Sequence, residues 1–168
     1  MTRPKLLLYM TLGEFEGLRL ADFDDRLVLQ KRVYLLQNFG FSMGYRYNWY
    51  VRGPYSPQLT EDAFAAQARL RDLQRQSDDY SLTTESLEMI ATYKAFENRL
   101  GGSQLPLLLE LAASIHYLRH VGFLLGGKEP DNIAKSLQQR GKSFTEQQFS
   151  TAWDALNEHG LIESGVVT

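Results

Sequence analysis

The chain has 168 residues, of which 43% are hydrophobic and 23% charged, with a formal net charge of −2 and no cysteine. This length and composition predict a single globular domain with its own core. The missing cysteines exclude disulfides, zinc ribbons and thiol catalysis. The near-neutral charge argues against a bulk electrostatic grip on nucleic acid or on an anionic membrane.

The N-terminal 20 residues predict a weakly patterned helix rather than a targeting signal. They hold a short apolar run but lack the longer apolar region and the small-residue cleavage site of a signal peptide. The absence of cysteine fits the reducing cytosol, so we expect a cytoplasmic protein. The most apolar stretch, residues 105–125, is interrupted by Glu110, His116, Arg119 and His120. It predicts a buried core helix and no membrane insertion.

A helix is predicted over residues 25–39, where Leu29, Val33 and Leu36 share one face and Gly40 can end it. The alternation in residues 45–52 predicts a strand. Its inner face would carry Tyr45, Tyr47, Trp49 and Val51, and its outer face Arg46, Asn48, Tyr50 and Arg52. We expect a tight turn at Gly53 and Pro54. Ser56 can then cap a helix that starts at Pro57 and runs to about Gln76.

Four further helices are predicted, over residues 85–100, 106–125, 130–140 and 146–159. Thr145 and Gln148 have the spacing of a capping box that opens the last one. Residues 161–163 can start a strand after Gly160. The fold class we expect is mainly α: a single domain with a small β element and a winged-helix-like C-terminal part.

Signals for catalysis and cofactors are poor. The run Gly141-Lys142-Ser143 lacks the upstream glycine of a phosphate loop, because residue 136 is serine. His116 and His120 have the spacing of two ligands on one helix face, but no glutamate adjoins the first, as a catalytic zinc motif requires. We therefore expect no enzyme, no metal and no cofactor.

Two sets of residues are candidates for contact with a partner. One set combines aromatic and arginine side chains near the expected turn, which suit a protein contact or stacking on single-stranded nucleic acid: Tyr50, Arg52 and Tyr55. The other is acidic and is either a solvated face or an acidic contact surface: Glu14, Glu16, Asp22, Asp24 and Asp25. Arg46, Arg52, Arg69, Arg71 and Arg75 could form a basic patch.

The last predicted helix is badly charged for reading a DNA groove. Its outward positions hold Glu146, Gln147, Asp154, Asn157 and Glu158, and the helix has no lysine or arginine. A helix that enters a groove must approach phosphates. We expect weak nucleic-acid binding or none, although a winged-helix transcriptional regulator remains the alternative function.

The segment "LQKRVYLLQNFG" (29–40), the aromatic strand and "GPYSPQL" (53–59) resemble YwgA-like domains. "LELAASIHYL" (109–118) and "FSTAWDALNEHGLI" (149–162) resemble the toxin-binding C-terminal domain of DarG antitoxins, and more distantly Panacea domains. The chain departs from many DarG domains at "RLRDLQRQSDDYSL" (69–82), where those have a glycine- and histidine-rich stretch.

The resemblance implies a non-catalytic domain that binds and blocks a DarT-like toxin, a DNA ADP-ribosyltransferase. In DarG proteins a separate macrodomain removes ADP-ribose from DNA. The chain shows no macrodomain, so the resemblance implies an isolated domain or a stand-alone relative. We expect such a blocker to cover the toxin's basic DNA-binding cleft. Its carboxylates would replace phosphates and its aromatic rings would replace bases.

Overall fold

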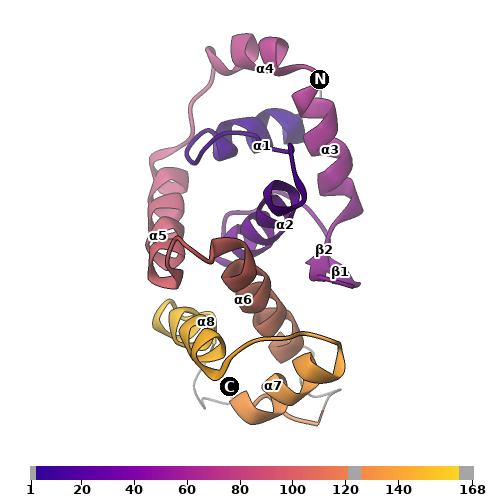
Figure 1. Cartoon of the computed structure of the whole chain (residues 1–168). Coiled ribbons are helices and arrows are strands. Elements are labelled where there is room, and N and C mark those ends of the chain that lie inside the picture. The colour runs from indigo at the N-terminus through magenta and orange to yellow at the C-terminus, as the bar shows by residue number, and fades with distance from the viewer. Residues whose placement is uncertain (1–2, 121–125, 163–168) are drawn as a thin grey trace.

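The structure, a computed structural model, describes residues 3–120 and 126–162 (Figure 1). Within these ranges the chain is mainly helical with one two-stranded antiparallel sheet, so the predicted mainly α fold with a small β element is confirmed. The winged-helix-like character of the C-terminal part stays a prediction. In chain order the elements are α1 (Arg3–Leu12), α2 (Phe23–Asn38), β1 (Asn48–Tyr50), β2 (Gly53–Tyr55), α3 (Pro57–Gln67), α4 (Leu70–Ser77), α5 (Thr84–Leu100), α6 (Leu105–His120), α7 (Pro130–Gln139) and α8 (Glu146–Glu158).

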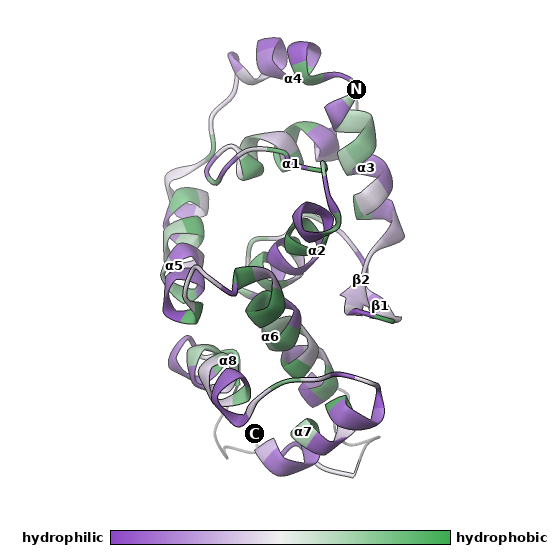
Figure 2. Cartoon of the chain, in the orientation of Figure 1, coloured by the Kyte–Doolittle hydropathy of each residue, from purple (hydrophilic) through white to green (hydrophobic). Residues whose placement is uncertain are grey.

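The core is built around α2 and α6, which cross at the centre of the molecule (Figure 1). The predicted stripe Leu29, Val33 and Leu36 on α2 is buried. Helix α6 is the apolar core helix expected from the sequence, and it is strongly hydrophobic along its first turns (Figure 2). It contacts α2, β2, α5, α7 and α8, so it links the two ends of the fold. Its expected extension over 121–125 lies outside the described residues.

Three predicted boundaries are wrong. The helix expected over the N-terminal 20 residues ends at Leu12, and residues 13–16 form a turn that leads away from it. The helix expected from Pro57 to Gln76 is broken at Ala68 and Arg69, which form a turn between α3 and α4. The break redirects the chain, so that α4 packs on α1 and buries Leu73 while Leu70 is 40% exposed. After α8, Leu161 and Ile162 form a bend rather than the start of a strand, and residue 163 lies outside the described residues.

The predicted helix caps are confirmed. Thr145 and Gln148 form the capping box of α8, with the Gln148 N–H donating to Thr145 Oγ1 (3.1 Å) and the Thr145 N–H donating to Gln148 Oε1 (2.9 Å). Ser56 caps α3 by accepting from the Leu59 N–H, with Pro57 at the first helical position. These caps satisfy N–H groups that a helix leaves without partners.

The β element is a short hairpin rather than a strand over 45–52. Its turn is at Val51 and Arg52, not at Gly53 and Pro54, because Tyr50 pairs directly with Gly53. Val51 therefore sits on the turn and is 88% exposed, so its predicted place on the inner face is wrong. The rest of the alternation holds: the inner set Tyr45, Tyr47 and Trp49 is buried or half-buried, and the outer set Arg46, Asn48, Tyr50 and Arg52 is exposed.

Two consecutive side chains of α2 hold this hairpin. The Gln30 Nε2 donates to the Ser56 carbonyl (2.9 Å) and to Thr60 Oγ1 (2.8 Å), while its Oε1 accepts from the Ser56 N–H (2.9 Å). Lys31 Nζ donates to the Pro54 carbonyl at 2.6 Å. We call this pair the Gln–Lys anchor. It connects the "LQK" segment of α2 to the "GPYS" segment of the hairpin through buried hydrogen bonds.

Gly53 lets the hairpin approach α6 closely. Its φ of +92° lies in the left-handed region, and a Cβ on this residue would lie 2.4 Å from Ser114 Oγ. Ser114 is fully buried, so its hydroxyl has little room to move away. Both conformation and space therefore require glycine here.

We predict that Gly53→Ala costs about 2–5 kcal/mol of stability, from left-handed strain of roughly 1–2 kcal/mol plus overpacking of roughly 1–3 kcal/mol. Gly44→Ala is the matched control, because Gly44 has φ +82° but nothing within 4 Å of its Cβ position. It should cost only the strain. Urea unfolding measures both, and adding Ser114→Ala should restore part of the loss in Gly53→Ala. Equal losses at the two glycines would contradict the close contact.

Candidate partner-binding site

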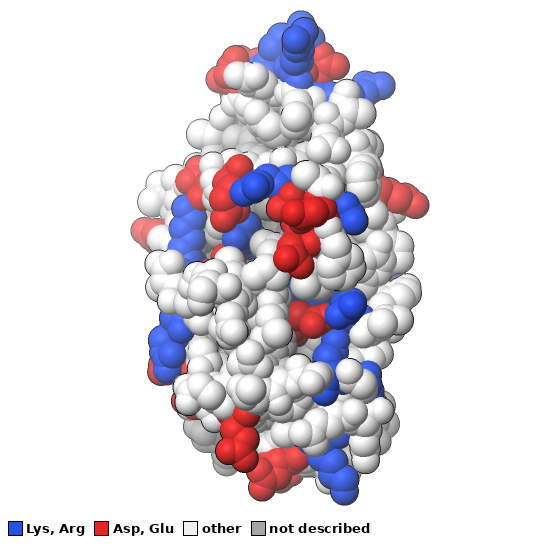
Figure 3. All heavy atoms as spheres, in the orientation of Figure 1, with Lys and Arg blue, Asp and Glu red and all other residues white. Residues whose placement is uncertain are grey.

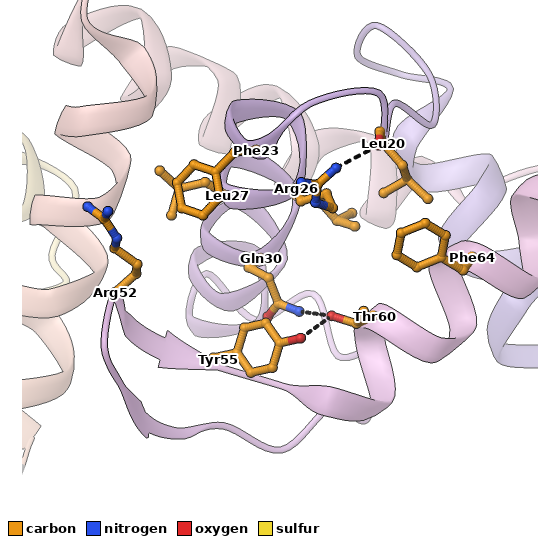
Figure 4. Close-up of a pocket in the computed structure, with 10 residues that line it drawn as sticks. Leu20, Phe23, Arg26, Leu27, Gln30, Arg52, Tyr55, Thr60 and Phe64 are labelled. Carbon is orange, nitrogen blue, oxygen red and sulfur yellow. Dashed lines mark hydrogen bonds between the residues drawn. The ribbon is translucent and has the colours of Figure 1, made fainter.

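The predicted contact residues Tyr50, Arg52 and Tyr55 gather around one pocket of about 320 Å³, which we call the aromatic pocket. It lies between the N-terminal half of α2, the hairpin and α3 (Figure 4). Arg52 and Tyr55 line it directly, and the Tyr50 ring packs edge-on against Tyr55 at 5.2 Å between centroids. The remaining lining residues are Leu20, Phe23, Arg26, Leu27, Leu29, Gln30, Thr60 and Phe64.

Two exposed phenylalanines extend this pocket onto the surface. Phe23 is 50% exposed and Phe64 is 46% exposed. The Arg52 guanidinium lies 5.3 Å from the centre of the Phe23 ring. Neither ring was among the contact residues predicted from the sequence. Phe23 was missed because α2 begins two residues before the predicted start, and Phe64 because its neighbour Ala63 carries the buried stripe. For Phe64, the sequence held one usable signal, which is an aromatic residue on the otherwise polar face of α3.

The Gln–Lys anchor fixes the floor of the aromatic pocket. The Tyr55 hydroxyl lies 2.7 Å from Thr60 Oγ1, the same oxygen that accepts from Gln30 Nε2 (Figure 4). On the opposite wall, Arg26 Nη1 donates to the Leu20 carbonyl at 3.1 Å. Tyr55 and Arg26 are thus held by hydrogen bonds, and the Arg52 guanidinium lies near the Phe23 ring. Such a site can bury an apolar or aromatic group, and its lining offers no nucleophile paired with a base.

The structure brings together three of the five candidate acids. Glu16, Asp24 and Asp25 line a second depression of about 240 Å³, next to the N-terminal half of α2. Leu29 lines both pockets, so the acidic depression and the aromatic pocket lie side by side along α2. Figure 3 shows acidic side chains gathered over this end of α2, with basic side chains beside them. Asp22 caps α2 by accepting from the Asp25 N–H at 2.8 Å, and Glu14 is exposed and lines neither pocket.

Two of these carboxylates are already engaged. Glu16 accepts from Arg32 Nη1 at 2.9 Å, and although burial opposes it, this hydrogen bond keeps the pKa of Glu16 below its usual value. Arg32 in turn makes a buried two-point contact with Glu97 at 2.7 and 2.8 Å. Asp25 accepts from the Ala21 N–H and lies 3.8 Å from Arg19. Within the described residues, Asp22 and Asp24 are exposed and form no ion pair, so their charges are available for contact even though Asp22 Oδ1 caps α2.

A buried polar cluster, which the sequence did not predict, lies beneath the hairpin. Burial lowers the pKa of Lys31 to about 7, an effect that the Glu110 carboxylate opposes. Lys142 Nζ lies 3.3 Å from Glu110 Oε1, without the geometry of a hydrogen bond. Ser114 Oγ, next to Gly53, has no hydrogen-bond partner among the described residues. The cluster supports the hairpin from within, and Lys31 itself is almost fully buried.

His116 and His120, the two histidines with metal-ligand spacing, lie in different environments. His116 Nδ1 lies 2.7 Å from the Tyr34 hydroxyl, and burial lowers its pKa to about 4, so the ring is neutral near pH 7. His120 is exposed. Among the described residues no group of three or more histidine, aspartate or glutamate side chains is placed to hold a metal ion.

Comparisons with known proteins add no relative. No protein-family model matches the chain, and no match is found among curated proteins or among solved structures. Across 3–120 and 126–162, none of the helices has both the length and the apolar character needed to cross a bilayer.

The lowered Lys31 pKa predicts a pH dependence of stability. Between pH 7 and its ordinary pKa of 10.5, the unfolded chain binds the proton that the folded protein lacks, so the free energy of unfolding rises with pH over this window. Lys31→Met should remove this contribution. The free energy of unfolding of the wild type minus that of the variant should therefore rise from about pH 7 to about pH 9.5. Chemical unfolding at each pH measures it. Parallel pH curves for the two proteins would contradict the assignment.

Proposed function

We propose that this protein is a non-catalytic antitoxin-type domain that binds a DarT-like DNA ADP-ribosyltransferase and covers its DNA-binding cleft. The observation that supports this most is the aromatic pocket, where half-exposed rings and an arginine gather on a rigid scaffold beside unpaired carboxylates. The resemblance of "LELAASIHYL" (109–118) and "FSTAWDALNEHGLI" (149–162) to the toxin-binding C-terminal domain of DarG antitoxins names the class of partner.

The start of α2 carries the chemistry that such a partner requires. Asp22, Phe23 and Asp24 are consecutive and all exposed, so two carboxylates and one aromatic ring project from the same helix end. A cleft that holds DNA presents cations for phosphates and flat surfaces for bases. Carboxylates at this site would speed association by attraction, and the rings would slow release once buried.

The contact centre proposed here is narrower than the set of residues drawn from the sequence. Tyr50, Arg52 and Tyr55 stay in it because they surround the aromatic pocket, and Phe23 and Phe64 join them. Asp22 and Asp24 supply the charge. Glu16 and Asp25 contribute less, because Arg32 and Arg19 already offset them.

The second candidate, a DNA-binding regulator, is disfavoured by the surface of α8. Its exposed side chains are Glu146, Gln147, Ser150, Asp154, Asn157 and Glu158. None of these is basic, and a helix that reads a groove must approach phosphates. We expect no duplex binding at micromolar protein in a gel-shift titration. Binding that is tight in low salt and falls steeply with added salt would favour the regulator instead.

The proposal predicts that the protein inhibits a DarT-like enzyme encoded in the same genome. Purified toxin would be assayed for ADP-ribosylation of a single-stranded oligonucleotide, with affinity measured on a catalytically inactive toxin. Phe23→Ala and Asp24→Lys should each weaken binding by about 2 kcal/mol if they are hot spots, roughly thirtyfold in Kd. Both side chains are exposed, so the fold should persist.

Leu87→Ala and Glu88→Lys provide the matched control. Leu87 is 40% exposed, and the exposed Glu88 follows it on α5, away from both pockets. These changes should leave the affinity within about twofold, as expected for surface substitutions away from a contact. Equal effects of the two variant pairs would remove the aromatic pocket from the proposal. A toxin that remains active with excess wild-type protein would refute the proposed function.

A further inference from the structure

We propose that the groove between α7 and α8 binds an arginine side chain of a protein partner. The groove has a volume of about 400 Å³ and lies at the end of the fold opposite α4 (Figure 1). Pro130, Asp131, Ala134 and Gln138 line one side, spaced to share one face of α7. The other side comes from α8, and Phe144 lines it from the connecting segment. This inference does not rest on the proposed function, since it requires only a partner with an accessible arginine.

Three aromatic rings form a stack along the α8 side of the groove. Phe144 and Phe149 stack at 5.6 Å between centroids, and Phe149 and Trp153 at 5.8 Å, with interplanar angles of 28° and 24°. Phe149 is largely buried, whereas Phe144 and Trp153 are half-buried and keep accessible surface. A guanidinium is planar and weakly hydrated, so it stacks on such ring faces better than an ammonium does.

Carboxylates line the groove beside these rings. Asp131, Glu146 and Asp154 are exposed, and none of them forms an ion pair within the described residues. No lysine or arginine is part of the lining. The Arg119 guanidinium lies 5.4 Å from the Trp153 ring but outside the lining, and the three carboxylates outnumber it. The groove therefore repels phosphates and attracts cations.

Aromatic faces and carboxylates together select arginine. An apolar side chain would leave the carboxylates unused, and a lysine ammonium would gain the charge attraction but not the planar stacking. Arginine satisfies both, because its guanidinium can lie against a ring while its N–H groups donate to a carboxylate.

The test uses the whole chain and three fluorescein-labelled nine-residue peptides of glycine and serine that carry two arginines, two lysines or two glutamines. Fluorescence anisotropy should show the arginine peptide binding most tightly, the lysine peptide several-fold more weakly, and the glutamine peptide not at all. The double variant Glu146→Gln/Asp154→Asn should weaken arginine-peptide binding by about fivefold or more, as two partly exposed charge pairs would.

Glu61→Gln/Glu88→Gln is the matched control, because it removes the same charge from exposed positions on α3 and α5. It should leave the affinity within about twofold. NMR of the tryptophan indole N–H groups locates the site without any variant: the Trp153 signal should shift on titration and the Trp49 signal should not. Equal binding of the arginine and lysine peptides, an equal loss in the control variant, or an unmoved Trp153 signal would each overturn the proposal.

Discussion

The fold depends most on the Gln–Lys anchor, the set of hydrogen bonds by which two side chains of α2 hold the hairpin. Gln30 uses its amide as both donor and acceptor on Ser56, a residue 26 positions away, and Lys31 holds the Pro54 carbonyl beside it. These bonds fix β2 and the first turn of α3 against the core. Everything that surrounds the aromatic pocket, from Arg52 to Thr60, takes its place from them.

The anchor is polar and buried, which makes it specific but costly. Gln30 is fully bonded, whereas burial disfavours the charged form of Lys31 and the Glu110 carboxylate favours it. A well-packed apolar pair could be equally stable or more so. Removing one partner, however, would leave a buried carbonyl or amide without a bond, a loss of about 1–3 kcal/mol. Polar groups at this position therefore favour one register of the hairpin over its alternatives.

Helices and caps could be read from the sequence because their signals are local. The stripe on α2, the Ser56 cap and the Thr145–Gln148 capping box each depend on residues within one or two turns. The hairpin turn and the break at Ala68–Arg69 could not, since tertiary packing on α6 and α1 decides them. The site was half predictable: Tyr50, Arg52 and Tyr55 belong to a motif, whereas Phe23 and Phe64 join the pocket only when α2, α3 and the hairpin meet.

Native-state hydrogen exchange at the Ser56 amide tests the anchor most directly. That N–H donates to the side chain of Gln30 and not to a backbone carbonyl, so its protection reports the anchor itself. In the wild type it should exchange as slowly as the amides of α6, which open only with the whole fold. In Gln30→Ala the Ser56 amide should exchange much faster while α6 stays protected. Fast exchange at Ser56 in the wild type, or unchanged protection in Gln30→Ala, would contradict the account.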